Sequence, residues 1–245
     1  MRKTIMVLAL APVMMTSAVQ AAALQVSPTT VQFNAQGKAE RVWLSASGDT
    51  PVTGQVRVYQ WVQQDGKDVL TPTRDVVASP PVMTVPAGQT QLLRLVNKVP
   101  AGPAEKAYRL IVDELPAAGE VTPRAGVQFL LKYSIPVFVA PVSAGQAKTQ
   151  DKAKRALDGV TFSLQQQGKQ AWLTADNAKG SHVRLAALTY VTKAGRVYTL
   201  RPGLLGYVLA GSRQRWAVAS PTEAGDFRAI VNDDVAPETL LSWSR

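Results

Sequence analysis

Few side chains in this chain could do covalent or metal chemistry. His182 is the only histidine and there is no cysteine, so thiol nucleophiles and clusters of histidine ligands are excluded. Ser-His catalysis would depend on His182 alone, and a lone histidine at the start of an alternating segment is usually a surface or half-buried residue. The glycines are spaced as turns, without a phosphate-binding loop. We therefore expect no enzyme activity, no cofactor and no bound metal.

The acidic pair Asp233-Asp234 comes closest to a catalytic carboxylate dyad. Successive residues of a strand point to opposite faces, so these two carboxylates would not easily share one site. The pair directly follows Asn232 and a strand-like segment, and Asn and Asp both favour turns. A turn explains the pair better than catalysis does.

A long apolar ribbon at residues 127–139 is the strongest candidate for a binding element. Every odd position in it is apolar, whereas Lys132 and Ser134 are among the even ones. A period of two places the odd residues on one face of an extended strand, which at ~3.3 Å per residue would span roughly 43 Å. Pro136 has no N–H for a ladder, which favours a sheet edge, and a long apolar edge invites pairing with another chain. Burial of both faces in a sandwich core is the alternative that periodicity leaves open.

The segments that must position this ribbon are short, alternating and separated by turn residues. Turn signals recur about every eight to twelve residues, which indicates an all-β chain of immunoglobulin-like sandwiches. We expect a kink at Pro28, a hairpin turn at Asp65-Gly66 and a break at Pro202-Gly203. Strands are expected at residues 23–33, 41–47, 55–64, 82–85, 91–96, 106–114 and 127–139, and then at 160–165, 170–175, 182–191, 196–200, 207–209, 214–218 and 227–231.

The length of 245 residues is enough for two ordinary domains. Residues 142–151 are mostly small and polar, so we expect a short linker there, between domains at 24–145 and 146–245. Residues 1–23 combine a charged start, an apolar run and small residues at 21–23, which indicates a secretory signal peptide. A transmembrane helix is the alternative, but the run is short for the ~20 residues that a span needs. We expect an exported protein that is not embedded in a membrane.

The formal net charge is +10, from 27 Lys and Arg against 17 Asp and Glu. Such a balance favours acidic partners or anionic surfaces. The basic residues are scattered, apart from a modest cluster within residues 148–155, and no interleaved aromatic platform or nucleic-acid motif accompanies them. We therefore expect no nucleic-acid partner.

A series of short motifs resembles the periplasmic chaperones of chaperone-usher pilus assembly, and the archaic branch of that family in particular. The likeness covers most of the chain after residue 23, and the order and spacing of the motifs together make it specific. The motifs are Val26-Ser27-Pro28, Gln60-Trp61, Ser79-Pro80-Pro81, Pro86-Ala87-Gly88-Gln89, Leu93-Arg94-Leu95, Tyr108-Arg109, the run YSIPVFV at 133–139, the run GYVLAG at 206–211, Arg215-Trp216 and Phe227-Arg228-Ala229.

The resemblance implies a periplasmic protein that lends its seventh strand to pilin subunits lacking the last strand of their own fold, and passes them to an outer-membrane usher. Strand addition binds through ladder hydrogen bonds and through alternate apolar side chains. On the matching positions Val127, Phe129 and Leu131 would insert into the subunit, with Tyr133 at the end of the groove. Free copies could also associate through the same edge.

The resemblance also implies a basic anchor for the terminal carboxylate of the subunit. Here the chain departs from the better-known members, because their first-strand arginine falls on Thr30 and their seventh-strand lysine on Pro136. Arg94 and Lys132 are the basic candidates that we single out, and an arginine can hold a carboxylate with two hydrogen bonds. The ordinary alternatives are a surface arginine and a lysine that protects the strand edge.

Two other functions fit parts of the same pattern. An exported structural or adhesive protein of two sandwiches, which binds glycan or polymerises, would share the β composition and the signal peptide. A periplasmic hydrolase is disfavoured because the catalytic groups that it needs are missing.

Overall fold

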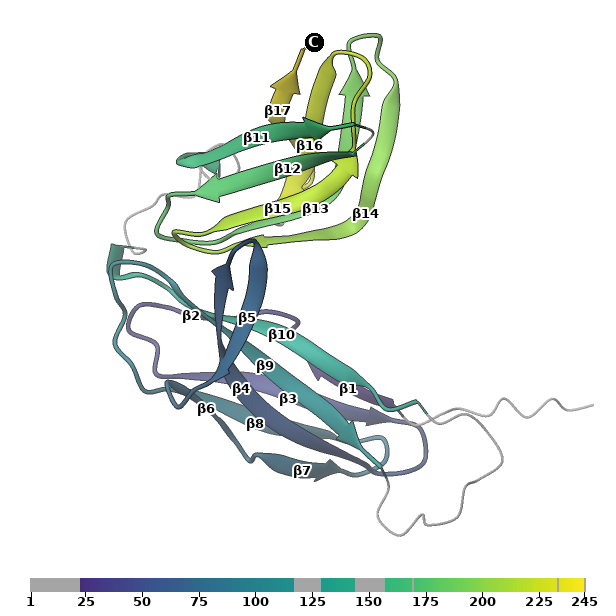
Figure 1. The fold of residues 1–245 in the computed structure, drawn as a ribbon. Coiled ribbons are helices and arrows are strands. Elements are labelled where there is room, and N and C mark those ends of the chain that lie inside the picture. The colour runs from purple at the N-terminus through teal and green to yellow at the C-terminus, as the bar shows by residue number, and fades with distance from the viewer. Residues whose placement is uncertain (1–22, 117–128, 144–156, 169, 233, 245) are drawn as a thin grey trace, which may run out of the picture.

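The computed structural model describes residues 23–116, 129–143, 157–168, 170–232 and 234–244. They form two β-sandwiches, one above the other in Figure 1, which confirms the all-β, two-sandwich prediction. The expected signal peptide, apart from Ala23, and the boundary at 145–146 lie outside the described residues, so both stay predictions. The strands are β1 (Ala23–Ser27), β2 (Val31–Phe33), β3 (Ala39–Ser47), β4 (Val52–Gln64), β5 (Lys67–Pro72), β6 (Val76–Ser79), β7 (Val82–Val85), β8 (Thr90–Asn97), β9 (Lys106–Leu115), β10 (Lys132–Val139), β11 (Val160–Gln167), β12 (Gln170–Asn177), β13 (Val183–Thr192), β14 (Val197–Val208), β15 (Arg213–Ala219), β16 (Gly225–Val231) and β17 (Pro237–Trp243).

The first sandwich packs the sheet β1-β3-β8-β6 against the sheet β2-β10-β9-β4-β5, with β7 paired to β4. Alternating residues of both sheets fill the space between them, as the period of two predicts. On β3, for example, Val42 and Leu44 are buried while Trp43 faces outward. The buried residues that join the two sheets include Leu24, Phe33, Leu93, Leu95, Tyr108, Leu110, Val112, Ile135, Val137 and Val139.

The first strand changes sheets partway along its length. β1 pairs antiparallel with β3 in one sheet, whereas β2 pairs parallel with β10 in the other. The predicted kink at Pro28 lies in the link between them, where the Ser27–Pro28 peptide bond is cis. Because only β2 reaches β10, only a short part of that strand receives a second neighbour.

The hairpin of β4 and β5 reaches from the first sandwich to the second (Figure 1). Its turn is the predicted Asp65-Gly66, and both residues have positive φ, 52° and 71°. Two left-handed residues in a two-residue loop match the right-handed twist of the strands that they connect. The turn therefore carries the tip of β4 to the second sandwich.

The second sandwich packs the sheet β11-β12-β15 against the sheet β14-β13-β16-β17. The predicted break at Pro202-Gly203 is wrong as a strand boundary, because β14 runs through it as one strand. The ladder accommodates these residues by a shift of register: Arg201 lies opposite Leu188 and Leu204 opposite Ala186. The sequence analysis did not predict β17, because partly buried and exposed residues do not alternate regularly along this strand.

The register shift between β13 and β14 is a bulge that contains Ala187 of β13. Substitutions of Ala187 test how much this bulge depends on local backbone strain. Its φ is 51°, in the left-handed region, which costs an L-residue roughly 1–2 kcal/mol. Ala187→Val should lower the free energy of unfolding by about 1–2 kcal/mol, since a β-branched residue tolerates this region worse than alanine. Ala187→Gly should change it by less than about 0.5 kcal/mol, since steric relief and added backbone entropy offset each other. Denaturant unfolding of both variants measures the difference, and equal effects would contradict it.

Candidate functional site

The edge of β10 lacks a second neighbour over most of its length. β9 pairs with the whole strand, from Lys132 opposite Asp113 to Val139 opposite Lys106. β2 pairs only with residues 137–139. Among the described residues, no strand therefore covers the other side of 132–136. Pro136, which the sequence analysis placed at an edge, is the last residue before the parallel pairing begins.

The predicted strand of thirteen residues is too long in its described part. β10 begins at Lys132, Phe129 and Leu131 precede it, and Val127 lies outside the described residues. The reason is the length of the partner, because β9 ends at Leu115. The last pairing contacts join Leu131 to Glu114: the Glu114 N–H donates to the Leu131 carbonyl oxygen (2.9 Å), and the Leu131 N–H donates to Glu114 Oε2 (3.3 Å).

The odd residues of the ribbon divide into a buried group and an exposed group. Ile135, Val137 and Val139 are buried in the core of their own sandwich. Tyr133 is half-buried against the same core, and its hydroxyl donates a hydrogen bond to the carbonyl oxygen of Leu24. In contrast, Phe129 is 78% exposed and Leu131 is 37% exposed. The alternative of a wholly buried strand therefore describes residues 135–139 but not the apolar side chains that precede them.

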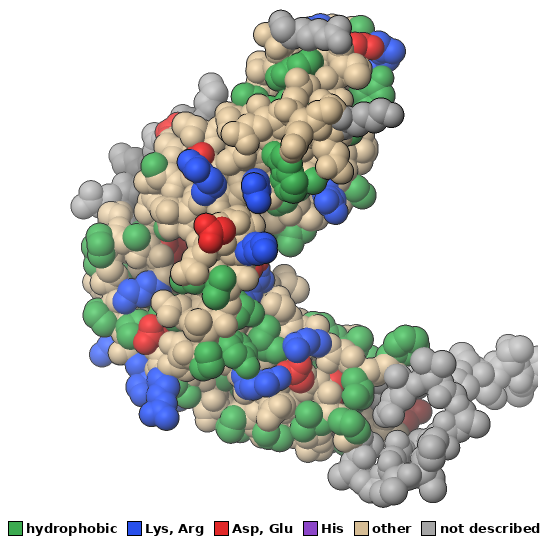
Figure 2. Space-filling view, in the orientation of Figure 1, with side chains coloured by type: hydrophobic (Ala, Val, Ile, Leu, Met, Phe, Trp, Pro, Cys, Tyr) green, Lys and Arg blue, Asp and Glu red, His purple; other side chains and the backbone are tan. Residues whose placement is uncertain are grey.

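The outer face of the β10-β9-β4 sheet forms the floor of a cleft between the sandwiches. The second sandwich covers one end of this face, and the molecule is deeply hollowed beside it (Figure 2). An apolar cluster from both sandwiches closes that end; its members are Trp61, Ala107, Phe138, Tyr207 and Leu209. We call this contact between the two sandwiches the seam. Phe138 is on the even face of β10, so the same strand contributes odd residues to the core and an even residue to the seam.

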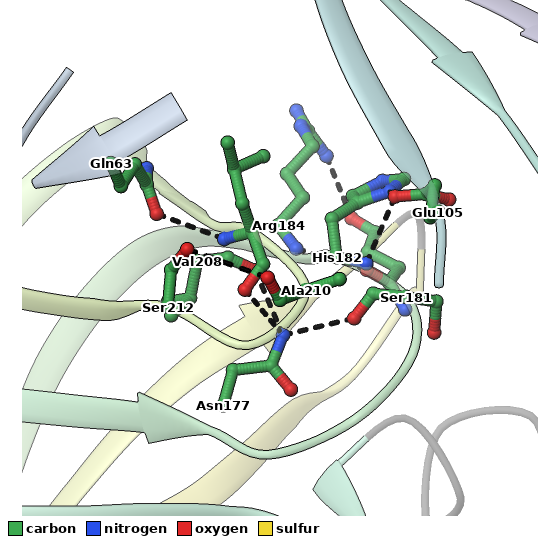
Figure 3. Close-up of polar contacts among 11 residues, drawn as sticks. Gln63, Glu105, Asn177, Ser181, His182, Arg184, Val208, Ala210 and Ser212 are labelled. Atoms are coloured by element: carbon green, nitrogen blue, oxygen red, sulfur yellow. Dashed lines mark hydrogen bonds and ion pairs between the residues drawn. The ribbon is translucent and has the colours of Figure 1, made fainter. Parts of the chain in front are cut away.

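Polar contacts fix the two sandwiches at this seam (Figure 3). The Gln63 side chain acts like a strand edge, because Nε2 donates to the Tyr207 carbonyl oxygen (2.9 Å) and Oε1 accepts from the Leu209 N–H (2.9 Å). The buried Asn177 amide donates to the carbonyl oxygens of Val208 and Leu209 at the end of β14, and to that of Ser181 before β13. The end of β14 is therefore held from both sandwiches.

His182 is part of this seam, and its partners among the described residues are structural ones. Its Nδ1 lies 2.6 Å from Glu105 Oε1, and its backbone N–H donates to the same oxygen (3.0 Å). Its ring stacks on Phe138, with centroids 3.7 Å apart. Sequence reasoning could not find this role, because Glu105 and His182 are 77 positions apart and come from different sandwiches.

Arg109 is the cation at the closed end of the cleft, and the sequence analysis did not single it out as a binding residue. Its guanidinium lies 3.6 Å from the centroid of the Trp61 ring and 5.5 Å from that of Tyr207. Burial lowers the pKa of Arg109, and the nearby Asp68 and Tyr207 oppose that shift. Within the described part of the chain, its guanidinium donates no hydrogen bond. The buried Trp61 Nε1 also lacks an acceptor there.

The two basic residues that we predicted as anchors do not lie together. Arg94 is exposed on β8, opposite Arg41 and Ser79, and faces away from the core because its neighbours in the chain are buried. It therefore belongs to the outer face of the sheet that does not contain β10.

Lys132, in contrast, lies on the floor of the cleft and is already paired. Its Nζ is 3.2 Å from Asp113 Oδ1, and Asp113 also accepts a hydrogen bond from Arg57. Burial favours a higher pKa for Asp113, but the two cations outweigh it and hold the pKa below its usual value. An incoming carboxylate would have to compete with Asp113 for Lys132.

Other chemistry is sparse in the parts of the chain that the structure describes. They contain no cluster of three or more side chains that could hold a metal ion, and none of their helices is long and apolar enough to cross a membrane. The predicted turn at Asn232 is confirmed, since its φ is 55° and the Asp234 N–H donates to the Val231 carbonyl oxygen (3.2 Å). Asp233 lies outside the described residues.

Comparison with known proteins gives one family and a consistent group of structures. Residues 23–144 match the family of pili and flagellar-assembly chaperones, in its PapD N-terminal domain. The chain is 28% identical to a chain in the crystal structure of the CsuC–CsuE chaperone–tip adhesion subunit pre-assembly complex, from archaic chaperone-usher Csu pili of Acinetobacter baumannii. That match covers 89% of this chain and 96% of the other, with a TM-score of 0.66.

More distant structures share the fold. The YadV chaperone is 17% identical, with 88% of this chain and 96% of that chain covered and a TM-score of 0.62. A chain in the complex of the Salmonella enterica SafA pilin with the SafB chaperone is 16% identical, with 91% and 97% covered and a TM-score of 0.61. No curated protein gives a match.

Gln63 offers a test of how the seam is held. Gln63→Ala should lower the stability of the seam by about 1–3 kcal/mol, because the Tyr207 carbonyl and the Leu209 N–H both lose a partner. Small-angle X-ray scattering should then show a wider spread of distances between the sandwiches. Gln64→Ala is the matched control, since its exposed side chain makes no hydrogen bond within the described residues. Identical scattering and melting of the two variants would contradict the assignment.

Proposed function

Because this chain belongs to the PapD family, the pilus chaperones of the chaperone-usher pathway, we propose that it acts in the periplasm by adding the edge of β10 to an incomplete pilin subunit. Family membership favours this function over the structural or adhesive protein and over the hydrolase. The single observation that carries the proposal is the edge at residues 132–136, which no described strand covers, continued by the exposed Phe129 and Leu131.

The backbone of this edge supplies affinity that does not depend on the sequence of the partner. Unpaired N–H and C=O groups on a strand edge can extend a ladder with any extended chain. β9 holds β10 along its full length from the other side, so the edge is fixed in an extended conformation before a partner arrives. Such preorganisation lowers the entropy that binding costs.

The exposed apolar side chains supply the larger part of the expected binding energy. Phe129 and Leu131 have the same parity, so in an extended conformation both would point to one face of the added strand. Burial of each would contribute about 1.5–3 kcal/mol before the cost of ordering. We keep Val127 as a third inserting residue, and we place Tyr133 at the end of the groove, where its ring already packs on the core of the chaperone.

Two similar proteins are known in complexes with such partners. CsuC is known in a pre-assembly complex with the tip adhesion subunit CsuE, and SafB in a complex with the SafA pilin. By analogy we propose that pilin subunits are the partners of this chain, and that an outer-membrane usher receives the subunit from it. Without a subunit, the same edge is available for association between copies.

Phe129→Asp tests strand donation directly. A carboxylate at this position would be buried without a partner in the groove of the subunit, so capture should fall more than about a hundredfold. The measurement is co-purification of a co-expressed pilin subunit of the same pilus system with the tagged protein. Val82→Asp on β7 is the control, since Val82 is 48% exposed and belongs to a different edge. Undiminished capture by Phe129→Asp would show that this position does not enter the subunit.

We further propose that Arg109, rather than Arg94 or Lys132, anchors the terminal carboxylate of the subunit. Pro136, which occupies the position of the family's seventh-strand lysine, lies directly opposite Arg109 in the ladder. In this chain the cation is therefore on β9 instead of the neighbouring β10, and it still faces the cleft beside the donated edge. A guanidinium with free N–H groups can bind a carboxylate through two charge-assisted hydrogen bonds.

Arg109→Gln should therefore weaken subunit binding by about ten- to a hundredfold, the equivalent of about 1.5–3 kcal/mol. Its effect on thermal unfolding should be smaller, because desolvation of the guanidinium and its stacking on Trp61 oppose each other. Arg94→Gln and Lys132→Gln serve as comparators in the same pull-down and melting assays. A larger binding loss in either comparator than in Arg109→Gln would move the anchor to that residue.

A further inference from the structure

The second sandwich presents an exposed corner of β14 to the cleft. β14 comes down one side of this sandwich, bends, and runs along the side that faces the first sandwich (Figure 1). The register of β14 against β13 shifts between Arg201 and Leu204, which places the bend at Arg201, Pro202, Gly203 and Leu204. All four are exposed, and Leu204 is 51% exposed. Beyond the bend, Tyr207 and Val208 are buried. The exposed apolar side chain therefore lies where the strand leaves the seam.

This corner is continuous with the proposed subunit site. The unpaired edge of β10 ends at Pro136, which lies opposite Arg109, and the Arg109 guanidinium is 5.5 Å from the ring of Tyr207. Leu204 is three residues from Tyr207, about 10 Å along a strand. A chain that lies along β10 up to the closed end of the cleft therefore meets the β14 corner next.

The backbone of the corner is unsuited to strand addition, so the contact would be made by side chains. Pro202 has no N–H to donate, and Gly203 has a φ of 71°, outside the extended region. These features blunt the edge against pairing with other strands. They leave Leu204 as an exposed apolar side chain, with the exposed cation Arg201 three positions before it in the chain. This combination suits an apolar patch of a partner that also carries an acidic group.

We infer that the β14 corner is a second contact surface for the pilin subunit that β10 holds. The inference rests on the proposed function and assigns to the second sandwich a direct part in binding. Leu204 would pack against the surface of the subunit that flanks its open groove, and it would slow dissociation of a subunit that β10 has already engaged. A second copy of the chain is the competing occupant, and the experiment below separates the two.

The test compares Leu204→Asp with Val197→Asp. Val197 is on the same strand at the end far from the first sandwich, and it is 63% exposed. Each tagged variant is purified in complex with a co-expressed pilin subunit of the same pilus system, and its displacement by labelled wild-type protein is followed. We expect Leu204→Asp to be displaced about tenfold faster than wild type, and Val197→Asp at the wild-type rate. Equal rates for the two variants would overturn the inference.

Three further measurements keep the outcomes distinct. Capture of the subunit by Phe129→Asp is measured in parallel. If capture persists, strand donation fails. If capture is lost while Leu204→Asp and Val197→Asp are displaced at equal rates, only the β14 contact is overturned.

Thermal unfolding shows whether Leu204→Asp folds. If it does not fold, the milder variant Leu204→Ser is used in its place, and we expect it to be displaced about threefold faster than wild type. Size-exclusion chromatography of the free proteins detects association of copies, and loss of that association with unchanged displacement would assign the corner to a second copy and overturn the inference.

Discussion

The hydrogen-bonding capacity of one side of β10 is the constraint on which the rest of this structure depends. A strand inside a sheet has two neighbours, but β10 has β9 along its whole length and β2 along only three residues. The cause lies at the other end of the domain, where β1 pairs with β3 in the opposite sheet. Because the start of the domain is divided between the two sheets, residues 132–136 of β10 keep an edge that no described strand covers, while Leu24 of β1 and Phe33 of β2 both remain in the core.

The same strand lies in three environments, and the pleat of the backbone keeps them separate. Odd residues from Ile135 onward fill the core of the first sandwich, and the even residue Phe138 joins the seam with the second. The last contacts with β9 are at Leu131, so Phe129 lies beyond the partner strand and is exposed, and Leu131 at the end of the pairing is partly exposed. Stability and binding are therefore assigned to different residues of one ribbon. A substitution at the exposed end can affect partners with little cost to the fold.

Electrostatics at the cleft depend on how each cation is already partnered. Lys132 is neutralised by Asp113, which also holds Arg57, whereas Arg109 is stacked on Trp61 and donates no hydrogen bond to any residue that the structure describes. Buried or half-buried charges without hydrogen-bond acceptors are costly, so their presence favours a role in binding an anion. The seam contributes by fixing Tyr207 beside Arg109, and thereby also fixes the start of the bend in β14.

The amino-acid sequence by itself determined the all-β class, the kink at Pro28, the Asp65-Gly66 turn and the apolar ribbon, because each of these follows from local backbone preference or from a period of two. It also carried the likeness to pilus chaperones, through motifs that are contiguous in the chain. Only the tertiary structure decided where the ribbon stops being core, since that depends on where β9 ends. It also brought Arg109 opposite Pro136, His182 to Glu105, and the bend of β14 to the cleft. These juxtapositions join residues that are distant in the chain, and no local pattern records which strands become neighbours.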